Sequence, residues 1–407
     1  MSGDVEIRTI TDDEREAWIR ALDLSFSAIT KDDELAVVLP VIETDRSFAA
    51  VDDGRFVGTS AAITFRMVVP GGNRVPAAGI TAVGVNPTHR RRGINTRMMA
   101  ALLDQAEERG EPFAALSASE GAIYGRYGYG LASFSTEFQA DSTRMDYVRG
   151  VEITGSIKLI SKEEALPIIS RVYDTSLRPG GPERSDAERD MAFSHLHEEE
   201  RDKPWFYAIH RDDAGEPDAY AVYTMKHDWP RSIPTGTVDV KESMASTPES
   251  YAAIWRYVFD IDLVATVTAW NRPPDDPLLL LLREPRRLRA GLTDGLWVRL
   301  VDIPAALGAR RYPLDGRVVF EVSDAFRPAT AGRYELVVQD GEGRCERTDA
   351  EPDFAGSVNM LGSVYLGGVS FSDLAQASQV EVRNEKILSE ADTMFSSSPA
   401  PWCPWAF

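Results

Sequence analysis

Three consecutive arginines and a glycine form the segment of this sequence that is best suited to binding an anion. Residues 90–92 are all arginine, Gly93 follows them, and an apolar periodicity typical of a helix begins at Ile94. The preceding residues, 80–85, have the pattern of a strand. Because free amides at a helix N-terminus and guanidinium groups both attract phosphate, the segment predicts a phosphate-binding loop. The alternative is a solvated basic patch without a ligand.

The C-terminal tail carries aromatic side chains that are costly to leave in water. Trp402, Trp405 and Phe407 lie within six residues, in a segment whose serines and prolines would otherwise predict a frayed end. Burying each large ring is worth about 1.5–3 kcal/mol. We therefore expect the tail to dock against the folded protein.

The elements that must position the arginine loop predict an α/β (α+β) layer. Thr11 and Glu14 have the spacing of a capping box, so we expect a helix after them. Residues 47–69 read as strand, tight turn and strand, and residues 113–116 read as a short buried strand after the helix that Ile94 begins. The order helix, antiparallel strands, strand, helix, strand is typical of such a layer.

A weaker copy of this order follows in the second third of the chain. The turn at 212–215 and the strand at 238–240 are displaced from their counterparts at 52–55 and 83–85 by similar distances along the sequence. Thr247 then provides an N-cap for a helix. The matched offsets predict a duplicated domain.

The composition excludes some classes of protein. The 407 residues include 44 Lys and Arg against 64 Asp and Glu, a formal net charge of −20, and 43% are hydrophobic, which excludes a disordered chain. Since nucleic-acid binding depends on a basic face, we expect no nucleic-acid partner. The acidic field favours cationic ligands instead.

The cysteines and the longest apolar run bear on location. Cys345 and Cys403 match neither a disulfide framework nor a zinc pattern, and the first residues show no export signal. The aliphatic run 278–282 is far too short to cross a bilayer. We therefore expect a cytoplasmic protein with no membrane span. His195 and His197 lack a third ligand, so we expect surface histidines and no metal.

Residues 90–95 resemble the acetyl-CoA-binding motif of the GNAT N-acetyltransferases, Q/R-x-x-G-x-G/A, except that its last position holds Asn95. In that family the loop holds the pyrophosphate of acetyl-CoA, and the strand before it pairs with the pantetheine arm. A later tyrosine- and glycine-rich stretch is similar to the family's closing element, in which a tyrosine protonates the departing thiolate. Tyr124 has the matching position, four residues before the Gly-Tyr pair at 128–129. The alternative is a turn whose tyrosines only pack.

The whole chain resembles the enhanced intracellular survival (Eis) acetyltransferases of actinobacteria. The resemblance rests on Pro-Thr-His-Arg-Arg-Arg-Gly at 87–93, Ala-Ser-Glu-Gly at 118–121, Asp-Gly-Leu-Trp at 294–297 and Pro-Ala-Ala-Leu at 304–307. It implies tandem GNAT folds, the second degenerate, and a sterol-carrier-protein-like domain, with the parts at 1–149, 150–302 and 303–407. The second copy would be silent because Asp239 and Glu242 stand where it needs arginines and glycine.

The resemblance also implies roles for particular residues. The free carboxylate of Phe407 would act as general base, since an α-carboxyl group has a pKa of about 3.3–3.7 and is ionised at neutral pH. Tyr124 would act as general acid. The residues implied for acetyl-CoA binding are Val83, Gly84, Val85, Arg91, Arg92, Gly93, Ile94, Asn95, Thr96, Ser119 and Glu120.

These inferences predict direct transfer of an acetyl group from acetyl-CoA to a primary amine of a polycationic acceptor: an aminoglycoside, a polyamine or a lysine side chain. A backbone N–H near residues 83–85 would stabilise the oxyanion, no metal would take part, and the resemblance implies a homo-hexamer. The alternative is a non-catalytic binding or scaffold protein with a lipid-carrier-like domain. The retained arginine run and Tyr124 argue against that alternative.

Overall fold

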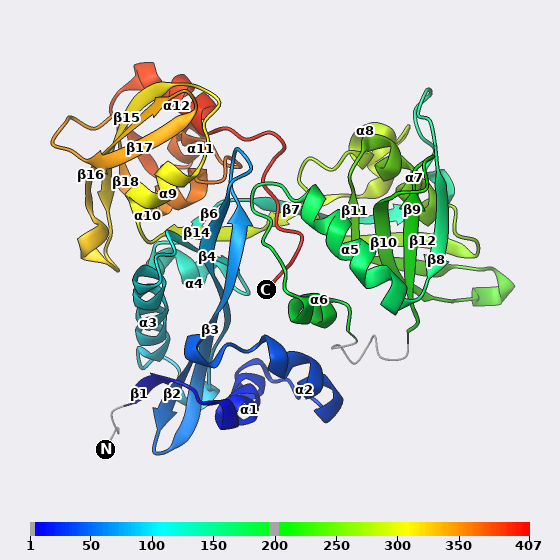
Figure 1. Cartoon of the computed structure of the whole chain (residues 1–407), viewed down its shortest axis with the longest axis horizontal. Coiled ribbons are helices and arrows are strands. Elements are labelled where there is room, and N and C mark those ends of the chain that lie inside the picture. The colour runs from blue at the N-terminus through cyan, green and yellow to red at the C-terminus, as the bar shows by residue number, and fades with distance from the viewer. Residues whose placement is uncertain (1–4, 195–202) are drawn as a thin grey trace. The chain divides into compact units, whose positions relative to one another are not determined.

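The computed structural model describes residues 5–194 and 203–407, which form two compact units (Figure 1). Within the described residues, the first unit contains 5–133, 178–194 and 294–407, and the second contains 134–177 and 203–293. Each unit is described by itself below. The described part of the chain has no helix with the length and apolar character needed to cross a membrane.

The first unit contains a seven-stranded sheet in which β4 and β5 are the parallel pair. The strands in spatial order are β1 (Glu6–Thr9), β2 (Ser47–Asp52), β3 (Arg55–Val68), β4 (Arg74–Val85), β5 (Phe113–Ser117), β14 (Leu296–Leu300) and β6 (Gly130–Leu131). The helices of this part are α1 (Arg15–Phe26), α2 (Asp32–Val38), α3 (Ile94–Glu108) and α4 (Gly121–Tyr124). The capping box at Thr11 is present, as predicted.

Helix α3 follows the arginine loop and buries the predicted apolar face. Ile94, Met98, Leu102 and Ala106 are all buried on it. The helix contacts β3 and β4, so its packing holds the loop against the sheet. The local pattern of apolar residues and the observed helix therefore agree.

The C-terminal part of the first unit forms a five-stranded sheet with its own helices. The strands in spatial order are β17 (Glu342–Arg347), β16 (Gly332–Gln339), β15 (Gly316–Ser323), β18 (Phe354–Ser357) and β19 (Val380–Val382). The helices are α9 (Ile303–Ala309), α10 (Val358–Val364), α11 (Phe371–Gln376) and α12 (Leu388–Phe395). One apolar core joins this sheet to the seven-stranded sheet of the first unit, because Phe65 and Phe113 belong to the same cluster as Phe320 and Phe371.

The second unit repeats the seven-stranded arrangement. Its strands in spatial order are β13 (Gly291–Asp294), β7 (Phe134–Asp141), β12 (Val264–Arg272), β11 (Gly236–Ala245), β10 (Pro217–Lys226), β9 (Trp205–Arg211) and β8 (Ser156–Ile160). Its helices are α5 (Lys162–Ser176), α7 (Pro248–Phe259) and α8 (Leu278–Leu281). The predicted duplication is therefore present in the fold.

The two repeats exchange a strand. β7 follows β6 directly along the chain, yet it pairs with β12 in the sheet of the second unit. β14 lies far later in the sequence and pairs with β5 and β6 in the first unit. The exchange completes both sheets with strands that are remote in sequence.

Residues 178–194, which we call the arm, lie between α5 and β9 in the sequence but fold with the first unit. The arm contains helix α6 (Asp186–Ala192), whose N-cap Ser185 forms a capping box with Glu188. Its first residues run alongside β3, where Met67 and Pro182 form an antiparallel bridge.

Candidate active site

Strands β4 and β5 separate partway along their length. Their pairing runs from Ala77 opposite Phe113 to Gly79 opposite Ala115 and stops there, although both strands continue. A bulge in β4 accompanies the separation, with Ala82 at a φ of 52°. Among the described residues, the β5 side of β4 beyond Gly79 therefore has no strand partner. An extended ligand can use the backbone groups of that segment.

The loop after β4 leads into α3 through left-handed backbone. Arg91 has a φ of 63° and Gly93 has a φ of 74°. Gly93 is the N-cap of α3 and offers no side chain to the first-turn amides, which stay available to an anion. A Cβ placed on Gly93 would meet no atom within 4 Å, so the space in front of the loop is open. Both features fit a phosphate group.

The three arginines have different surroundings. Arg90 turns back and donates to the Val85 carbonyl at 3.3 Å. Arg92 pairs with Asp52 at 3.2 Å, and Asp52 also contacts His89 Nε2 at 3.2 Å. Arg91 is exposed and, within the part of the chain that the structure describes, makes no hydrogen bond or ion pair. Arg91 is thus the arginine best placed to turn toward a ligand.

The remaining loop residues lie on the first turn of α3. Asn95, at the position where the motif has Gly or Ala, has a buried Oδ1 that finds no hydrogen-bond partner among the described residues. The Thr96 hydroxyl lies 3.4 Å from the Tyr127 hydroxyl. Tyr127, to which the sequence assigns no role of its own, thereby connects the tyrosine-rich stretch to the loop.

Tyr124 ends helix α4, which follows β5 on the far side of the strand separation. Its side chain is buried, and its ring meets the Tyr129 ring edge to face at 6.0 Å. Burial raises the pKa of the Tyr124 phenol, and a hydrogen bond with Ser119 offsets only part of this effect. The phenol therefore keeps its proton at neutral pH and can donate it. Ser119 and Glu120 lie on the loop between β5 and α4, where Glu120 is exposed.

Residues from later in the chain hold the tyrosine-rich stretch in place. Asn359 on α10 donates to the carbonyls of Gly125 and Tyr129, both at 2.7 Å. Arg299 on β14 is fully buried and donates to the Tyr127 carbonyl at 2.8 Å. Helix α10 and the exchanged strand β14 thus fix the backbone that directly follows Tyr124.

The C-terminal tail, residues 396–407, docks against the first unit as predicted. Trp402 and Trp405 are each 5% exposed. The Phe407 ring meets the Phe65 ring of β3 edge to face at 5.0 Å, so the tail ends beside β3 (Figure 1). The Phe65 ring covers Gly79, where a Cβ would come within 2.2 Å of it. The last residue therefore packs on the side chain that covers the last paired rung of β4 and β5.

The structure brings the predicted site residues to one region of the first unit. Val83, Gly84 and Val85 lie on the unpaired part of β4, the loop follows them, and Tyr124 follows the end of β5. Sequence reasoning missed Asp52, Phe65, Tyr127, Arg299 and Asn359. Tyr127 lies in the tyrosine- and glycine-rich stretch, where the sequence predicts no role for it. The other four contact the site across long stretches of chain, and no local pattern marks them.

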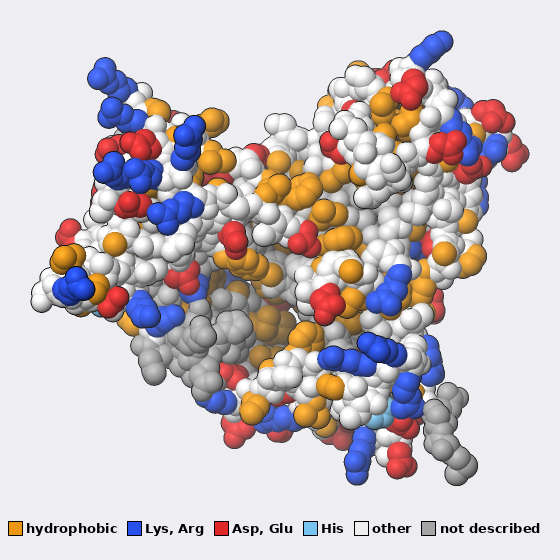
Figure 2. Space-filling model, turned by 180° about the vertical axis from the view of Figure 1, so that it is seen from behind, with side chains coloured by type: hydrophobic (Ala, Val, Ile, Leu, Met, Phe, Trp, Pro, Cys, Tyr) orange, Lys and Arg blue, Asp and Glu red, His pale blue; other side chains and the backbone are white. Residues whose placement is uncertain are grey.

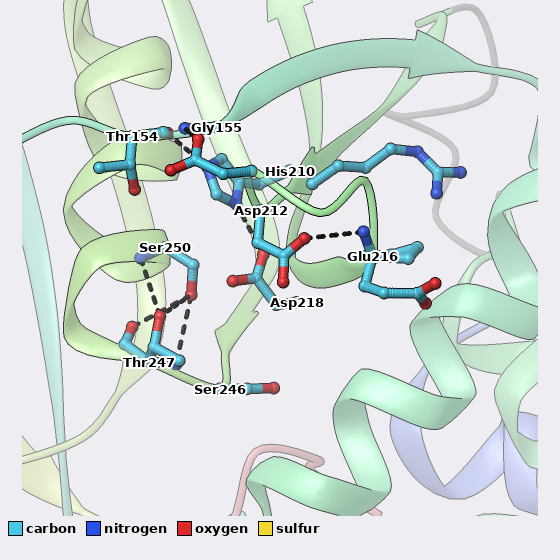
Figure 3. A network of polar contacts seen from close by, with 12 residues as sticks. Thr154, Gly155, His210, Asp212, Glu216, Asp218, Ser246, Thr247 and Ser250 are labelled. Atoms are coloured by element: carbon cyan, nitrogen blue, oxygen red, sulfur yellow. Dashed lines mark hydrogen bonds and ion pairs between the residues drawn. The ribbon is translucent and has the colours of Figure 1, made fainter.

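Among the described residues of the second unit, the connection between β11 and α7 forms no such loop. β11 runs to Ala245 and α7 begins at Pro248, so two residues connect them. Thr247 Oγ1 accepts a hydrogen bond from the Ser250 amide at 3.1 Å, so the side chain of Thr247 caps the N-terminus of α7 (Figure 3). The prediction that Asp239 and Glu242 occupy the loop position is wrong, because both lie inside β11. In this copy the strand passes almost directly into a capped helix, so the connection lacks the length and the free amides of the loop after β4.

A polar network in the second unit has a structural role (Figure 3). His210 is 1% exposed, with Nδ1 2.6 Å from an Asp218 oxygen and Nε2 2.9 Å from the Thr154 carbonyl. These contacts tie the segment just before β8 to β9 and β10. Among the described residues, no three His, Cys, Asp or Glu side chains gather as metal ligands would. His195 and His197 lie outside the described residues.

Comparisons with known proteins identify the class to which this fold and site belong. Residues 6–132 match a model of an acetyltransferase (GNAT) domain, residues 180–300 match a second model with the same description, and residues 303–404 match a sterol carrier protein domain. The chain is therefore an N-acetyltransferase built from two GNAT domains and a sterol-carrier-like domain.

Individual relatives narrow the class to one family. An uncharacterized N-acetyltransferase of Streptomyces avermitilis is 39% identical over 99% of both chains. The N-acetyltransferase Eis of Mycobacterium tuberculosis is 33% identical over 84% of this chain and 83% of its own. The structure of Eis1 from Mycobacterium abscessus has a TM-score of 0.86 and 31% identity, covering 99% of this chain and 100% of that one. The chain belongs to the Eis family of GNAT N-acetyltransferases.

Proposed function

We propose that this enzyme transfers an acetyl group from acetyl-CoA directly to a primary amine of a polycationic acceptor. The observation that carries the proposal is the separation of β4 and β5 beyond Gly79, with the uncapped start of α3 after one strand and Tyr124 after the other. Acetyl-CoA supplies the activated acyl group as a thioester.

The donor would be held by backbone and by guanidinium groups. The amides of Gly93, Ile94, Asn95 and Thr96, with the Arg91 side chain, would bind its pyrophosphate. The unpaired edge of β4 from Val83 to Val85 would pair with its pantetheine arm. The open space in front of Gly93 and the absence of a side-chain cap on α3 support this assignment.

Phe407 would act as the general base through its terminal carboxylate. The base must take a proton from the acceptor ammonium, because only the neutral amine carries a lone pair for attack. The packing of the Phe407 ring on Phe65 supports a carboxylate near the strand separation, because the Phe65 ring covers Gly79, the last residue of β4 that pairs with β5. Each residue of the tail that is fixed beforehand also reduces the entropy cost of aligning the base.

Tyr124 would act as the general acid. The raised pKa of its buried phenol supports this role, since the group reaches the transition state protonated and can pass its proton to the departing sulfur. A backbone N–H of residues 83–85 would stabilise the negative charge that develops on the carbonyl oxygen. Every step then uses groups of the first unit.

The acceptor is assigned by charge. The net charge of −20 attracts cations, and a diffusing polyamine gains from that field before any contact forms. On the face shown in Figure 2, acidic and basic side chains are mixed. Aminoglycosides, polyamines and peptide lysines all supply the required primary amine.

Thiol release from acetyl-CoA tests the proposal. The enzyme is incubated with acetyl-CoA and a panel of spermine, an aminoglycoside and a lysine-containing peptide, and free thiol is followed with time. We expect amine-dependent release and acetylated acceptor by mass spectrometry. No release with any acceptor, together with no thermal shift by CoA, would contradict the proposal and favour a scaffold protein.

Two variants test the assigned groups in the same assay. A glycine-serine extension after Phe407 moves the carboxylate, and Tyr124→Phe removes the proton donor. Each should lower kcat by about 10²-fold or more while CoA still shifts the melting temperature. Undiminished turnover in either variant removes that group from the mechanism.

The family resemblance supports a homo-hexamer. Sedimentation equilibrium of the full chain measures the assembly directly, and a monomer at micromolar concentration would contradict this part of the proposal.

A further inference from the structure

The arm, residues 178–194, is fixed to the edge of β3. The Val68 amide donates to the Gly181 carbonyl at 2.9 Å, and the Gly180 amide donates to the Val68 carbonyl at 2.8 Å. The pairing of β3 with β2 ends at Ala61, so these bonds satisfy a part of β3 that β2 does not reach. The Glu183 side chain adds an ion pair with Arg74 at 2.9 Å. The start of the arm is therefore held by the sheet.

The other side of the arm contacts the C-terminal tail. The Trp402 amide donates to the Pro179 carbonyl at 2.8 Å. The Arg178 guanidinium carbon lies 5.3 Å from the centre of the Trp402 ring. A Cβ on Gly180 would come within 3.3 Å of the Trp402 backbone, so the arm and the tail lie side by side without space between them. The arm therefore connects β3 to the tail.

Of the arm residues that contact the tail, Arg184 reaches the residues nearest to the C-terminus. Its guanidinium carbon lies 5.6 Å from the centre of the Trp405 ring, and its Nη2 donates to the Pro404 carbonyl at 3.4 Å. The Trp405 ring in turn packs against the Phe407 ring at 5.5 Å. Trp405 is two residues before Phe407. Because one residue spans at most about 3.6 Å, fixing Trp405 keeps the terminal carboxylate within about two residue lengths of that position.

We propose that Arg184 is a positioning residue that fixes the carboxylate of Phe407 through Trp405. The proposal rests on the proposed function, in which that carboxylate is the general base. It gives a role to a segment that in sequence belongs to the region matched by the second GNAT model. Arg184 does not touch a reacting atom in this account; it limits where the base can go.

An arginine suits this task better than a lysine. The planar guanidinium can stack on the Trp405 ring with one face and donate to the Pro404 carbonyl along its edge. A lysine ammonium keeps the charge but cannot make both contacts with one rigid group. Arg184→Lys should therefore restore only part of what Arg184→Gln loses.

Steady-state kinetics of the full-length enzyme test the proposal. Since displacing a catalytic group by about 1 Å can cost about 10²-fold, Arg184→Gln should lower kcat by about 10- to 100-fold. The KM for acetyl-CoA should stay within about threefold of the wild-type value, because the donor loop is untouched. The kcat of Arg184→Lys should lie between that of the wild type and that of Arg184→Gln. Asp190→Asn, at an exposed position of the same arm, is the control, and its kcat should stay within about twofold.

The chain extended past Phe407 separates this inference from the proposed function. If Arg184 acts through the carboxylate, Arg184→Gln should cost nothing further in the extended chain, because the base is already displaced. The same tenfold or greater loss in both backgrounds overturns the inference. If the extension lowers kcat but Arg184→Gln does not, the inference about Arg184 is overturned and the proposed general base is kept. An extension without effect overturns the proposed base and this inference together.

Carboxypeptidase digestion gives a readout that does not depend on turnover. Release of Phe407, followed by mass spectrometry, should be faster from Arg184→Gln than from Asp190→Asn or the wild type, since the terminus is less firmly held. Equal release rates would overturn the inference. If Arg184→Gln does not fold, the same comparison is made with Arg184→Lys.

Discussion

Gly93→Ala separates the backbone strain of the loop from its role in binding phosphate. Gly93 has a φ of 74°, and a Cβ at this position would meet no atom within 4 Å, so the added methyl clashes with nothing in the free enzyme. Gly54, in the turn between β2 and β3, has a φ of 73° and the same open surroundings. Gly54→Ala is therefore a control with the same conformational change and no predicted contact with the donor.

The two substitutions should cost similar stability and very different affinity. Left-handed backbone costs a non-glycine residue about 1–2 kcal/mol, so both melting temperatures should fall by about 2–8 °C. At Gly93 the methyl would also occupy the space that we propose for the pyrophosphate. Loss of one hydrogen bond to a charged group is worth about 1.5–3 kcal/mol, which weakens the Kd for CoA by about 10- to 150-fold.

Isothermal titration of CoA into the wild type and the two variants measures this difference. We expect Gly54→Ala to keep the wild-type Kd and Gly93→Ala to lose at least tenfold. The reasoning is refuted if both variants bind CoA equally well, because the open space at Gly93 would then not be where the phosphate lies.

Three further outcomes follow from the environment of single side chains. Tyr124→Phe should lower kcat by about 10²- to 10⁴-fold with unchanged CoA affinity. Within the described residues, the only hydrogen-bond partner of the Tyr129 hydroxyl is the Met99 sulfur, at 3.6 Å, so Tyr129→Phe should retain turnover. Equal losses in the two variants would contradict the assignment of Tyr124 as the acid. Because burial raises the pKa of Tyr124, the pH profile of kcat should show no alkaline decline below about pH 10, and a decline near pH 8 would point to another acid. Burial raises the thiol pKa of both Cys345 and Cys403 to about 12, so at pH 8 a thiol reagent should label neither in the native enzyme and both after denaturation, and rapid native labelling would contradict the burial.

Local patterns in the sequence predict much of the fold and the core of the site. The periodicity after Ile94 predicts α3, and the arginine run before Gly93 predicts a loop that the structure leaves uncapped and open. The aromatic tail predicts its own burial, because Trp402 and Trp405 have no favourable place in water. These features follow from residue types and their local spacing, which the sequence alone reveals, whereas the partners of the tail do not.

The remaining features depend on contacts between distant segments. Nothing in the pattern of β7 or β14 shows which sheet each strand joins, because both sheets accept the same alternation of side chains. The prediction for Asp239 and Glu242 fails because β11 continues past Val240 with buried Ser243 and Met244, and polar residues interrupt the apolar pattern. Strand length there is decided by pairing with β10.

The arm is the clearest case of information that sequence reasoning cannot supply. Residues 178–184 read as a proline- and glycine-containing connection, and such segments are normally surface loops. The structure pairs this connection with Val68 on one side and Trp402 on the other. Both partners are more than 100 residues away in sequence.

A crystal structure of the enzyme with CoA bound tests the central claim most directly. The account predicts the pyrophosphate against the amides of Gly93 to Thr96 with the Arg91 guanidinium turned toward it, and the pantetheine arm along β4 between Val83 and Val85. Density for CoA at any other place, or an uncapped α3 that stays empty at saturating CoA, would contradict it.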